Sequence, residues 1–305
     1  ALSNLFLMIS YIDTKTLKMN VKDVKSKITK NTQAILVTHL FGFFSDIKEI
    51  LRLGRENDIV IIEDCSHCIG SELENRKIGS FGDFSIFSFN KWKIVDCLGG
   101  GAVASSNFEI VKNIRDEIKD YSFPSKIEIS KRLFFNYASY ILLSRKIFSI
   151  FIYPTIYFFN LFGKDILADI TKDNLRISFS DKKKLRFTNF QARIGFKILA
   201  ELDEINKKRK NKYNLLYNRL EKKNNYKIKE GMSPIVFPVN TKDKKRLHTY
   251  LLRNWIDSTT KYYGYSLNKN NIEEDLLLIP IHDNITYKDI FYIADTLNDF
   301  IYFND

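Results

Sequence analysis

Residues that could carry out chemistry are concentrated between positions 64 and 101 of this 305-residue chain. Asp64 follows a short apolar run that is typical of a strand, Lys93 comes five residues after Ser88, and glycines occupy positions 99–101. A lysine amine can form a Schiff base with a carbonyl compound, and a nearby carboxylate can hold a proton on a bound heterocycle. A serine hydroxyl can hold a phosphate, and glycines permit a tight turn beside a ligand. The residue types and their spacing therefore indicate lysine Schiff-base chemistry.

A series of short motifs surrounds these residues and continues along the chain. In order, the motifs are Tyr11-Ile12-Asp13, Thr38-His39-Leu40-Phe41-Gly42, Glu63-Asp64-Cys65-Ser66-His67, Phe87-Ser88-Phe89 with Lys93, and Gly99-Gly100-Gly101-Ala102-Val103, followed by the weaker Phe190-Gln191-Ala192 and Leu278-Ile279-Pro280. In this order and spacing they resemble the DegT/DnrJ/EryC1/StrS family of sugar aminotransferases. The resemblance implies pyridoxal 5'-phosphate (PLP) as the cofactor and the aspartate-aminotransferase fold.

The resemblance also implies a role for each of the singled-out side chains. Lys93 would form the Schiff base, and it is preferred over Lys91 because the family places this lysine five residues after the serine of Phe-Ser-Phe. Asp64 would keep the pyridine nitrogen protonated, so that the ring withdraws electrons. His67 stands where the family usually has Gln or His and would contact the ring, and Ser88 would donate to the phosphate. Lys93 and Asp64 are therefore the predicted catalytic residues, and all four are predicted to bind the cofactor.

Each of these side chains also has a purely structural interpretation. Asp64 could cap the N-terminus of a helix that follows the strand. His67 could be a buried histidine with its hydrogen bonds satisfied, Ser88 an ordinary strand serine, and Lys93 a surface lysine. The sequence leaves these alternatives open.

Two features depart from the family pattern. The family has an asparagine that reaches the partner subunit's phosphate shortly before Arg-x-Thr, and Lys184 aligns there, ahead of Arg186-Phe187-Thr188. A lysine could still meet a phosphate as a point charge, so Lys184 is a further predicted cofactor ligand. Family members also begin with roughly a hundred further residues, a typical domain-sized length, which carry a phosphate-binding turn. We therefore expect an N-terminally incomplete PLP-binding domain.

Hydrophobic periodicity predicts alternating helices and strands in the first hundred residues. Strands are expected at residues 5–13, 34–38, 59–62, 86–89 and 102–105, and helices at 21–30 and 47–57. Such alternation indicates a parallel sheet that binds ligands at the carboxyl ends of its strands, where His39, Asp64 and Lys93 fall. The expected fold class is α/β, a fold type I PLP-dependent transferase with a mainly parallel central sheet and a smaller C-terminal α+β domain. The large domain would span residues 1–205 and the small one 206–305.

The middle of the chain has a different character. Residues 134–163 are dense in aromatic and aliphatic side chains, and their uncharged part, 147–163, is short for a membrane span. This apolar insertion is interpreted as a dimer-interface or core helical hairpin, with a peripheral membrane contact as the alternative. A helical period resumes over residues 189–220, and residues 231–240 are predicted to form a loop and a strand.

Composition narrows the class of partner. The net charge of +12 is compatible with a lysine-rich surface, with attraction of an anionic nucleotide sugar or phosphate cofactor, or with an acidic membrane surface. Nucleic acid is not expected, because the basic runs at 182–184 and 207–210 belong to no recognised binding module. The three cysteines form no disulfide framework, so we expect a cytoplasmic protein, with membrane association left open. The C-x-x-C at 65–68 lacks a second pair, so no metal site is expected.

The resemblance implies a homodimeric aminotransferase that transfers an amino group, from glutamate, to a keto sugar attached to a nucleotide. A related PLP sugar dehydratase would carry a histidine in place of Lys93, so the lysine argues against it. The alternative from a different class is a catalytically impaired, truncated paralogue that binds or dimerises with a complete subunit.

Overall fold

The structure is a computed structural model. It describes residues 8, 10, 12–13, 15–91, 93–142, 147, 150–151, 153–155, 158, 184–221, 226–259 and 276–302. The chain separates into two compact units, one made of Ala1–Val111 and Gly195–Asp305 and the other of Lys112–Ile194. The division into domains expected at residue 205 stays a prediction.

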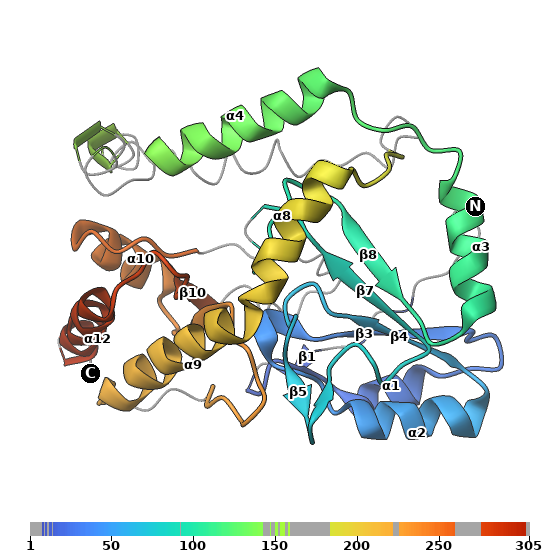
Figure 1. The fold of residues 1–305 in the computed structure, drawn as a ribbon. Helices are drawn as coiled ribbons and strands as arrows, with labels where there is room; N and C mark the ends of the chain where they lie inside the picture. The colour runs from blue at the N-terminus through green and yellow to red at the C-terminus, as the bar shows by residue number, and fades with distance from the viewer. Residues whose placement is uncertain are drawn as a thin grey trace. The chain divides into compact units, whose positions relative to one another are not determined.

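A four-stranded sheet forms the centre of the first unit (Figure 1). Its order is β3 (Ala34–Thr38), β4 (Val60–Asp64), β7 (Phe84–Ser88) and β8 (Gly101–Ala104). The first three strands are parallel and β8 runs antiparallel to β7, so the predicted mainly parallel sheet is confirmed.

One face of this sheet is covered by two helices, α1 (Val21–Lys27) and α2 (Ile47–Asn57) (Figure 1). The side chains that pack between sheet and helices recur at alternate strand positions and at helical spacing, as the sequence pattern requires: Val24, Ile35, Val37, Ile47, Ile50, Leu53, Ile59 and Ile61. The helix predicted over 47–57 has those bounds. The helix predicted over 21–30 ends earlier, because Ile28 is already extended.

The opposite face of the sheet carries the alternate residues of the same strands. Leu36, Val60, Ile86 and Val103 are between 37% and 50% exposed there. Because side chains alternate along a strand and the strands are in register, Asp64 and Ser88 belong to this open face. The expected site is therefore on the side of the sheet opposite α1 and α2.

The carboxyl-terminal part of the first unit contains a second, antiparallel pair, β9 (Val236–Asn240) and β10 (Leu276–Pro280). The helices α9 (Leu202–Arg219), α10 (Lys244–Arg253) and α12 (Tyr287–Tyr302) belong to the same part. Its core includes Tyr213 and Phe237 and extends to the segment after β3, through Leu40, Phe41, Phe43 and Phe44. The helical period predicted over 189–220 corresponds to two helices, α8 (Asn189–Ala200) and α9, with a turn at Glu201 between them.

Two short strand pairs also belong to the described part of this unit. They are β1 (Ile12–Asp13) with β2 (Lys18–Met19), and β5 (Glu72–Leu73) with β6 (Arg76–Lys77). Most of the strand expected over 5–13 lies outside the described residues.

The second unit contains most of α3 (Phe108–Ile118) and all of α4 (Lys126–Leu142). No residue of α4 is buried, and the aromatic side chains Phe134, Phe135, Tyr137 and Tyr140 are each 65–67% exposed. Most of the apolar insertion after α4 lies outside the described residues, so both its helical-hairpin interpretation and a membrane contact stay predictions. Within the part of the chain that the structure describes, every helix is too short or too polar to cross a membrane.

Candidate active site

The carboxyl ends of three neighbouring strands lie side by side in the first unit. Thr38 at the end of β3 pairs with Asp64 at the end of β4, and Asp64 pairs in turn with Ile86 of β7, two residues before Ser88. The backbone continues this pairing past the strands, because the His39 N–H donates to the Asp64 carbonyl at 3.1 Å. Parallel strands bring their carboxyl ends to one edge, which is where such sheets bind ligands.

Asp64 and Lys93 interact electrostatically at this edge. One oxygen of the Asp64 carboxylate accepts the Ser66 N–H at 3.0 Å. Burial lowers the pKa of the Lys93 amine from its ordinary value, and the negative charge of Asp64 opposes that shift. A lowered pKa increases the share of neutral amine at neutral pH, and the neutral amine is the nucleophile. The structure thus brings together the two residues predicted to be catalytic.

His67 belongs to the same group of charges. Burial and the nearby Lys93 amine lower the pKa of His67 to about 3, with Asp64 opposing the shift. Its Nδ1 accepts the Phe41 N–H at 3.4 Å, and its ring lies parallel to that of Phe41, with centroids 5.8 Å apart and an interplanar angle of 7°. His67 is therefore a neutral imidazole at physiological pH.

The segment that carries Lys93 is a loop closed by backbone hydrogen bonds. The Phe89 carbonyl accepts the N–H groups of Cys97 at 3.0 Å and Gly99 at 3.1 Å, and the Lys93 N–H donates to the Asn90 carbonyl at 3.2 Å. Gly99 and Gly100 have φ of +111° and +93°, a region that side chains disfavour. The glycine turn expected from the sequence is therefore present, and it closes the loop that holds Lys93.

The two predicted phosphate ligands have different surroundings. Ser88 is half-buried at the end of β7, and its Oγ accepts the Asn90 N–H at a long 3.5 Å. Lys184 belongs to the second unit, where its amine lies 5.7 Å from the centre of the Tyr121 ring. A role in phosphate binding stays a prediction for both residues.

Sequence reasoning assigned no function to the residue next to Asp64. Glu63 is fully buried on the helix-covered side of the sheet, and four N–H groups donate to its carboxylate. The donors are Gly79 at 3.0 Å, Phe81 and Gly82 at 2.7 Å each, and the His39 ring Nε2 at 3.2 Å. The signal that could have found it is a charged residue at an inward position of a strand pattern.

His39, Glu63 and Cys65 are close enough to be considered as a metal site, since one potential ligand atom of each lies within 4.8 Å of the others. Both ring nitrogens of His39 and both carboxylate oxygens of Glu63 are already engaged in hydrogen bonds. A metal ligand must present a free lone pair. His39 and Glu63 therefore form a hydrogen-bonded brace, and all three cysteines of the chain are buried and outside any disulfide.

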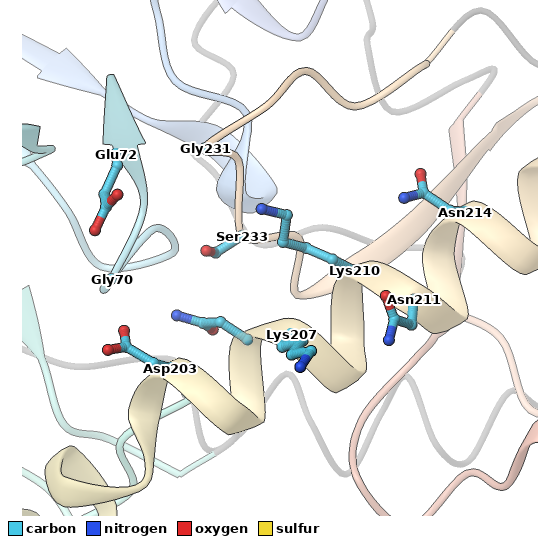
Figure 2. Close-up of a pocket in the computed structure, with 10 residues that line it drawn as sticks. Gly70, Glu72, Asp203, Lys207, Lys210, Asn211, Asn214, Gly231 and Ser233 are labelled. Carbon is cyan, nitrogen blue, oxygen red and sulfur yellow. The ribbon is translucent and has the colours of Figure 1, made fainter. Parts of the chain in front are cut away.

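A separate cavity of about 410 Å³ lies beside α9 (Figure 2). Its lining is mostly polar: Gly70, Glu72, Asp203, Asn206, Lys207, Lys210, Asn211, Asn214, Gly231 and Ser233. None of the predicted site residues lines it.

Comparison with known proteins finds similarity to one family of enzymes. Residues 8–132 match the DegT/DnrJ/EryC1/StrS aminotransferase family. GDP-perosamine synthase of Escherichia coli O157:H7 is 37% identical over 95 residues, which are 31% of this chain and 26% of that protein. The UDP-4-amino-4,6-dideoxy-N-acetyl-beta-L-altrosamine transaminase of Campylobacter jejuni is 35% identical over 111 residues, 35% of this chain and 30% of that one. These matches thus span less than a third of each relative's own length.

The fold likeness extends over nearly the whole chain. A DegT DnrJ EryC1 StrS aminotransferase from Brucella abortus superimposes with a TM-score of 0.68 at 17% identity, covering 96% of this chain and 73% of that one. The expected α/β fold with a mainly parallel central sheet, fold type I, is thereby confirmed. Residues 8–132 thus match the DegT/DnrJ/EryC1/StrS aminotransferase family in sequence, and the chain resembles a solved member of that family in fold.

Proposed function

We propose that this chain is a PLP-dependent aminotransferase that moves an amino group from glutamate to a keto sugar attached to a nucleotide. The observation that carries the proposal is the proximity of the Lys93 amine, whose pKa is lowered, to the Asp64 carboxylate at the carboxyl end of a parallel sheet. A lysine with a lowered pKa beside a specific charge partner is a common feature of catalytic sites.

The residues present have the chemistry that PLP requires. Asp64 is a carboxylate for the pyridine nitrogen, Lys93 an amine for covalent attachment, His67 a neutral ring, and Ser88 a hydroxyl for the phosphate. When bound, PLP acts as an electron sink that stabilises negative charge at the substrate carbon. The family that residues 8–132 match supports the same cofactor.

Each side chain has a definite task in this proposal. Asp64 holds a proton on the pyridine nitrogen, because an ionised carboxylate beside it favours the protonated form. Lys93 would attach the cofactor through its amine, and the same amine could carry a proton from the substrate carbon to the cofactor. His67 contacts the ring as an uncharged group, so that it adds no charge next to Lys93.

The substrate class is inferred from the relatives. Those named above are a GDP-perosamine synthase and a transaminase of a UDP-linked amino sugar. Both names describe enzymes of nucleotide-linked sugars, so we infer a nucleotide-linked keto sugar as the acceptor here. Glutamate as donor and a homodimeric assembly complete the proposal, as the resemblance implies.

Reductive trapping tests the proposal directly. The purified chain is incubated with PLP, treated with borohydride and digested, and the labelled peptide is identified by mass spectrometry. We expect the label on Lys93, together with visible absorbance that disappears on reduction.

Lys91 provides the internal control, because it lies two residues away in the same loop. The variant Lys91→Met should still be labelled, and Lys93→Met should not. Labelling on Lys91, or on neither lysine at saturating PLP, would contradict the proposed function.

A further inference from the structure

The ring of His67 is held by a backbone donor that fixes where its proton resides. The Phe41 N–H donates to Nδ1 of His67 at 3.4 Å, and the two rings lie parallel. A backbone N–H can only donate, so Nδ1 must be the unprotonated nitrogen of a neutral ring. The proton of His67 is then on Nε2.

This arrangement depends on an unusual backbone conformation at Phe41. Its φ is +55° and its ψ is 16°, a left-handed conformation that bulky residues rarely adopt. Phe41 is nevertheless 1% exposed, its carbonyl accepts the Ile235 N–H at 3.1 Å, and the Phe43 N–H closes the turn onto the Leu40 carbonyl at 2.8 Å. Such a conformation persists only where its surroundings enforce it.

The enforcing contacts come from His39 and Ser45, which lie at the two ends of the same turn. The Ser45 N–H donates to Nδ1 of His39 at 3.1 Å, and the Ser45 hydroxyl donates to the Thr38 carbonyl at 3.1 Å. His39 is fully buried, so its ring cannot exchange this partner for water. The ring therefore bridges the start of the turn to its end.

Glu63 in turn fixes the His39 ring. Because Nδ1 of His39 accepts from Ser45, its proton is on Nε2 and is donated to the Glu63 carboxylate at 3.2 Å. Glu63 is anchored independently by the Gly79, Phe81 and Gly82 N–H groups. Its pKa is lowered by the hydrogen bonds from His39, Gly82 and Gly79, which outweigh the effect of burial, so it is ionised at neutral pH.

We propose that Glu63 and His39 are positioning residues that hold the turn of residues 39–45 so that Phe41 fixes His67 with its proton on Nε2. His67 then presents a hydrogen-bond donor, and not an acceptor, through Nε2. The inference deepens the proposed function, because His67 is the predicted ring contact. The position of the His67 proton can be measured without any cofactor. This inference can therefore be refuted or supported independently of the proposed function.

The first test uses the unmodified protein, labelled with nitrogen-15 at its four histidines. Long-range proton–nitrogen spectra at pH 7 distinguish protonated from unprotonated ring nitrogens, and single replacements assign the signals. We expect both His67 and His39 to be neutral, with the proton on Nε2. A proton on Nδ1 of His67 would overturn the proposal.

The second test separates the two hydrogen bonds of His39 with a matched pair of variants. In His39→Gln the side-chain amide can still donate to Glu63, but the acceptor for Ser45 is removed. In His39→Asn the side-chain oxygen can still accept from Ser45, but the donor to Glu63 is removed. Amide hydrogen exchange of Phe41 reports on the bond to His67, because loosening the turn exposes that amide.

We expect exchange of the Phe41 amide to become about tenfold faster or more in His39→Gln, which corresponds to about 1.4 kcal/mol. The Phe81 and Gly82 amides, which are bound to Glu63, should keep their protection in that variant. In His39→Asn the Phe41 amide should also exchange faster, by a smaller factor of about threefold, because the bond to Ser45 remains while the anchor on Glu63 is lost. A Phe41 amide that is as well protected in both variants as in the unmodified protein would overturn the proposal, because neither hydrogen bond of His39 would then hold the turn.

A third test asks whether the turn of residues 39–45 influences cofactor binding. Adding PLP to the unmodified protein and to His39→Gln should give visible absorbance with different pH midpoints, because the ring contact has changed. If no PLP binds to either protein, the proposed function fails while the proton position of His67 remains measured.

Discussion

Glu63 and Asp64 are consecutive carboxylates at the end of β4, yet they have opposite environments. Glu63 faces the helix-covered side, is fully buried and receives four N–H donors. Asp64 faces the open side, is half-buried, and shares its electrostatic surroundings with Lys93 and His67. Because successive strand residues point to opposite faces, one residue step separates a carboxylate saturated by hydrogen bonds from one that lies beside Lys93.

The difference shows why Asp64, and not Glu63, has a carboxylate that can bind a ligand. A carboxylate surrounded by donors from its own chain is stable and ionised, but it has no lone pair left for a ligand. Asp64 accepts the Ser66 N–H and retains capacity for a further proton or donor. The following predictions test this contrast, from the largest expected effect to the smallest.

Removing the amine on the open side should have the greatest effect. Lys93→Met is expected to lower aminotransferase turnover by about 10²- to 10⁴-fold, because both covalent attachment and proton transfer depend on this side chain. Turnover is measured with PLP at saturation, and Lys91→Met serves as the control with nearly unchanged turnover. Comparable losses in the two variants would assign the effect to the loop and not to the Lys93 amine.

Neutralising Asp64 should affect chemistry and leave folding nearly intact. Asp64→Asn is expected to lower turnover by about 10²- to 10³-fold, since a neutral partner no longer holds the pyridine proton. Urea unfolding of the same variant should stay within about 1 kcal/mol of the unmodified protein. Turnover close to normal in Asp64→Asn would mean that the ring lies elsewhere.

Neutralising Glu63 should do the reverse and cost stability. Glu63→Gln is expected to lower the free energy of unfolding by about 3 kcal/mol at pH 7, because the buried donors lose their charged acceptor. Since the folded pKa of Glu63 is lower than its ordinary value of 4.5, its stabilisation is present above that pH and is lost as pH falls further. The variant should therefore lose less stability on acidification than the unmodified protein, as urea unfolding across pH 3 to 7 would reveal.

The ring of His67 should remain uncharged across the range in which the protein is assayed. With a pKa of about 3 in the folded state against an ordinary value of 6.5, its carbon-bound proton signals should not titrate between about pH 5 and pH 8. The unfolded chain binds the proton first, so His67 lowers the stability as pH falls below 6.5. A titration midpoint near 6.5 would mean that the ring is open to water and lacks the influence of Lys93.

The smallest effect on the free energy of unfolding is expected for an exposed ion pair. The Lys48 Nζ lies 2.5 Å from Oε1 of Glu74, and the two side chains are 58% and 68% exposed. Lys48→Met should change the free energy of unfolding by no more than about 0.5 kcal/mol, because solvent screens the pair. The free energy is measured by urea unfolding at low salt. A decrease close to that expected for Glu63→Gln would show that an exposed ion pair stabilises this protein as much as the buried Glu63 does.

Hydrophobic periodicity predicted the existence of the main elements better than their limits. The strand at 34–38 and the helix at 47–57 have their predicted bounds. The strand expected at 86–89 is Phe84–Ser88 instead, because its pairing with β4 begins at the Ile62–Phe84 partners. Strand limits depend on the hydrogen-bond partner across the sheet, which a single segment of sequence does not specify.

The sequence by itself indicated the resemblance to an aminotransferase family, the alternation that makes the sheet parallel, and the candidate residues Asp64, His67 and Lys93. These follow from residue type and spacing, which are properties of the chain. Only the tertiary structure decided that Glu63 is a saturated brace and that Phe41 and the His39 turn fix the proton of His67. Those roles arise from hydrogen bonds between residues 24 and 26 positions apart, such as His39 with Glu63 and Phe41 with His67. Folding alone brings these groups into contact, because the strand β4 must first lie beside β3.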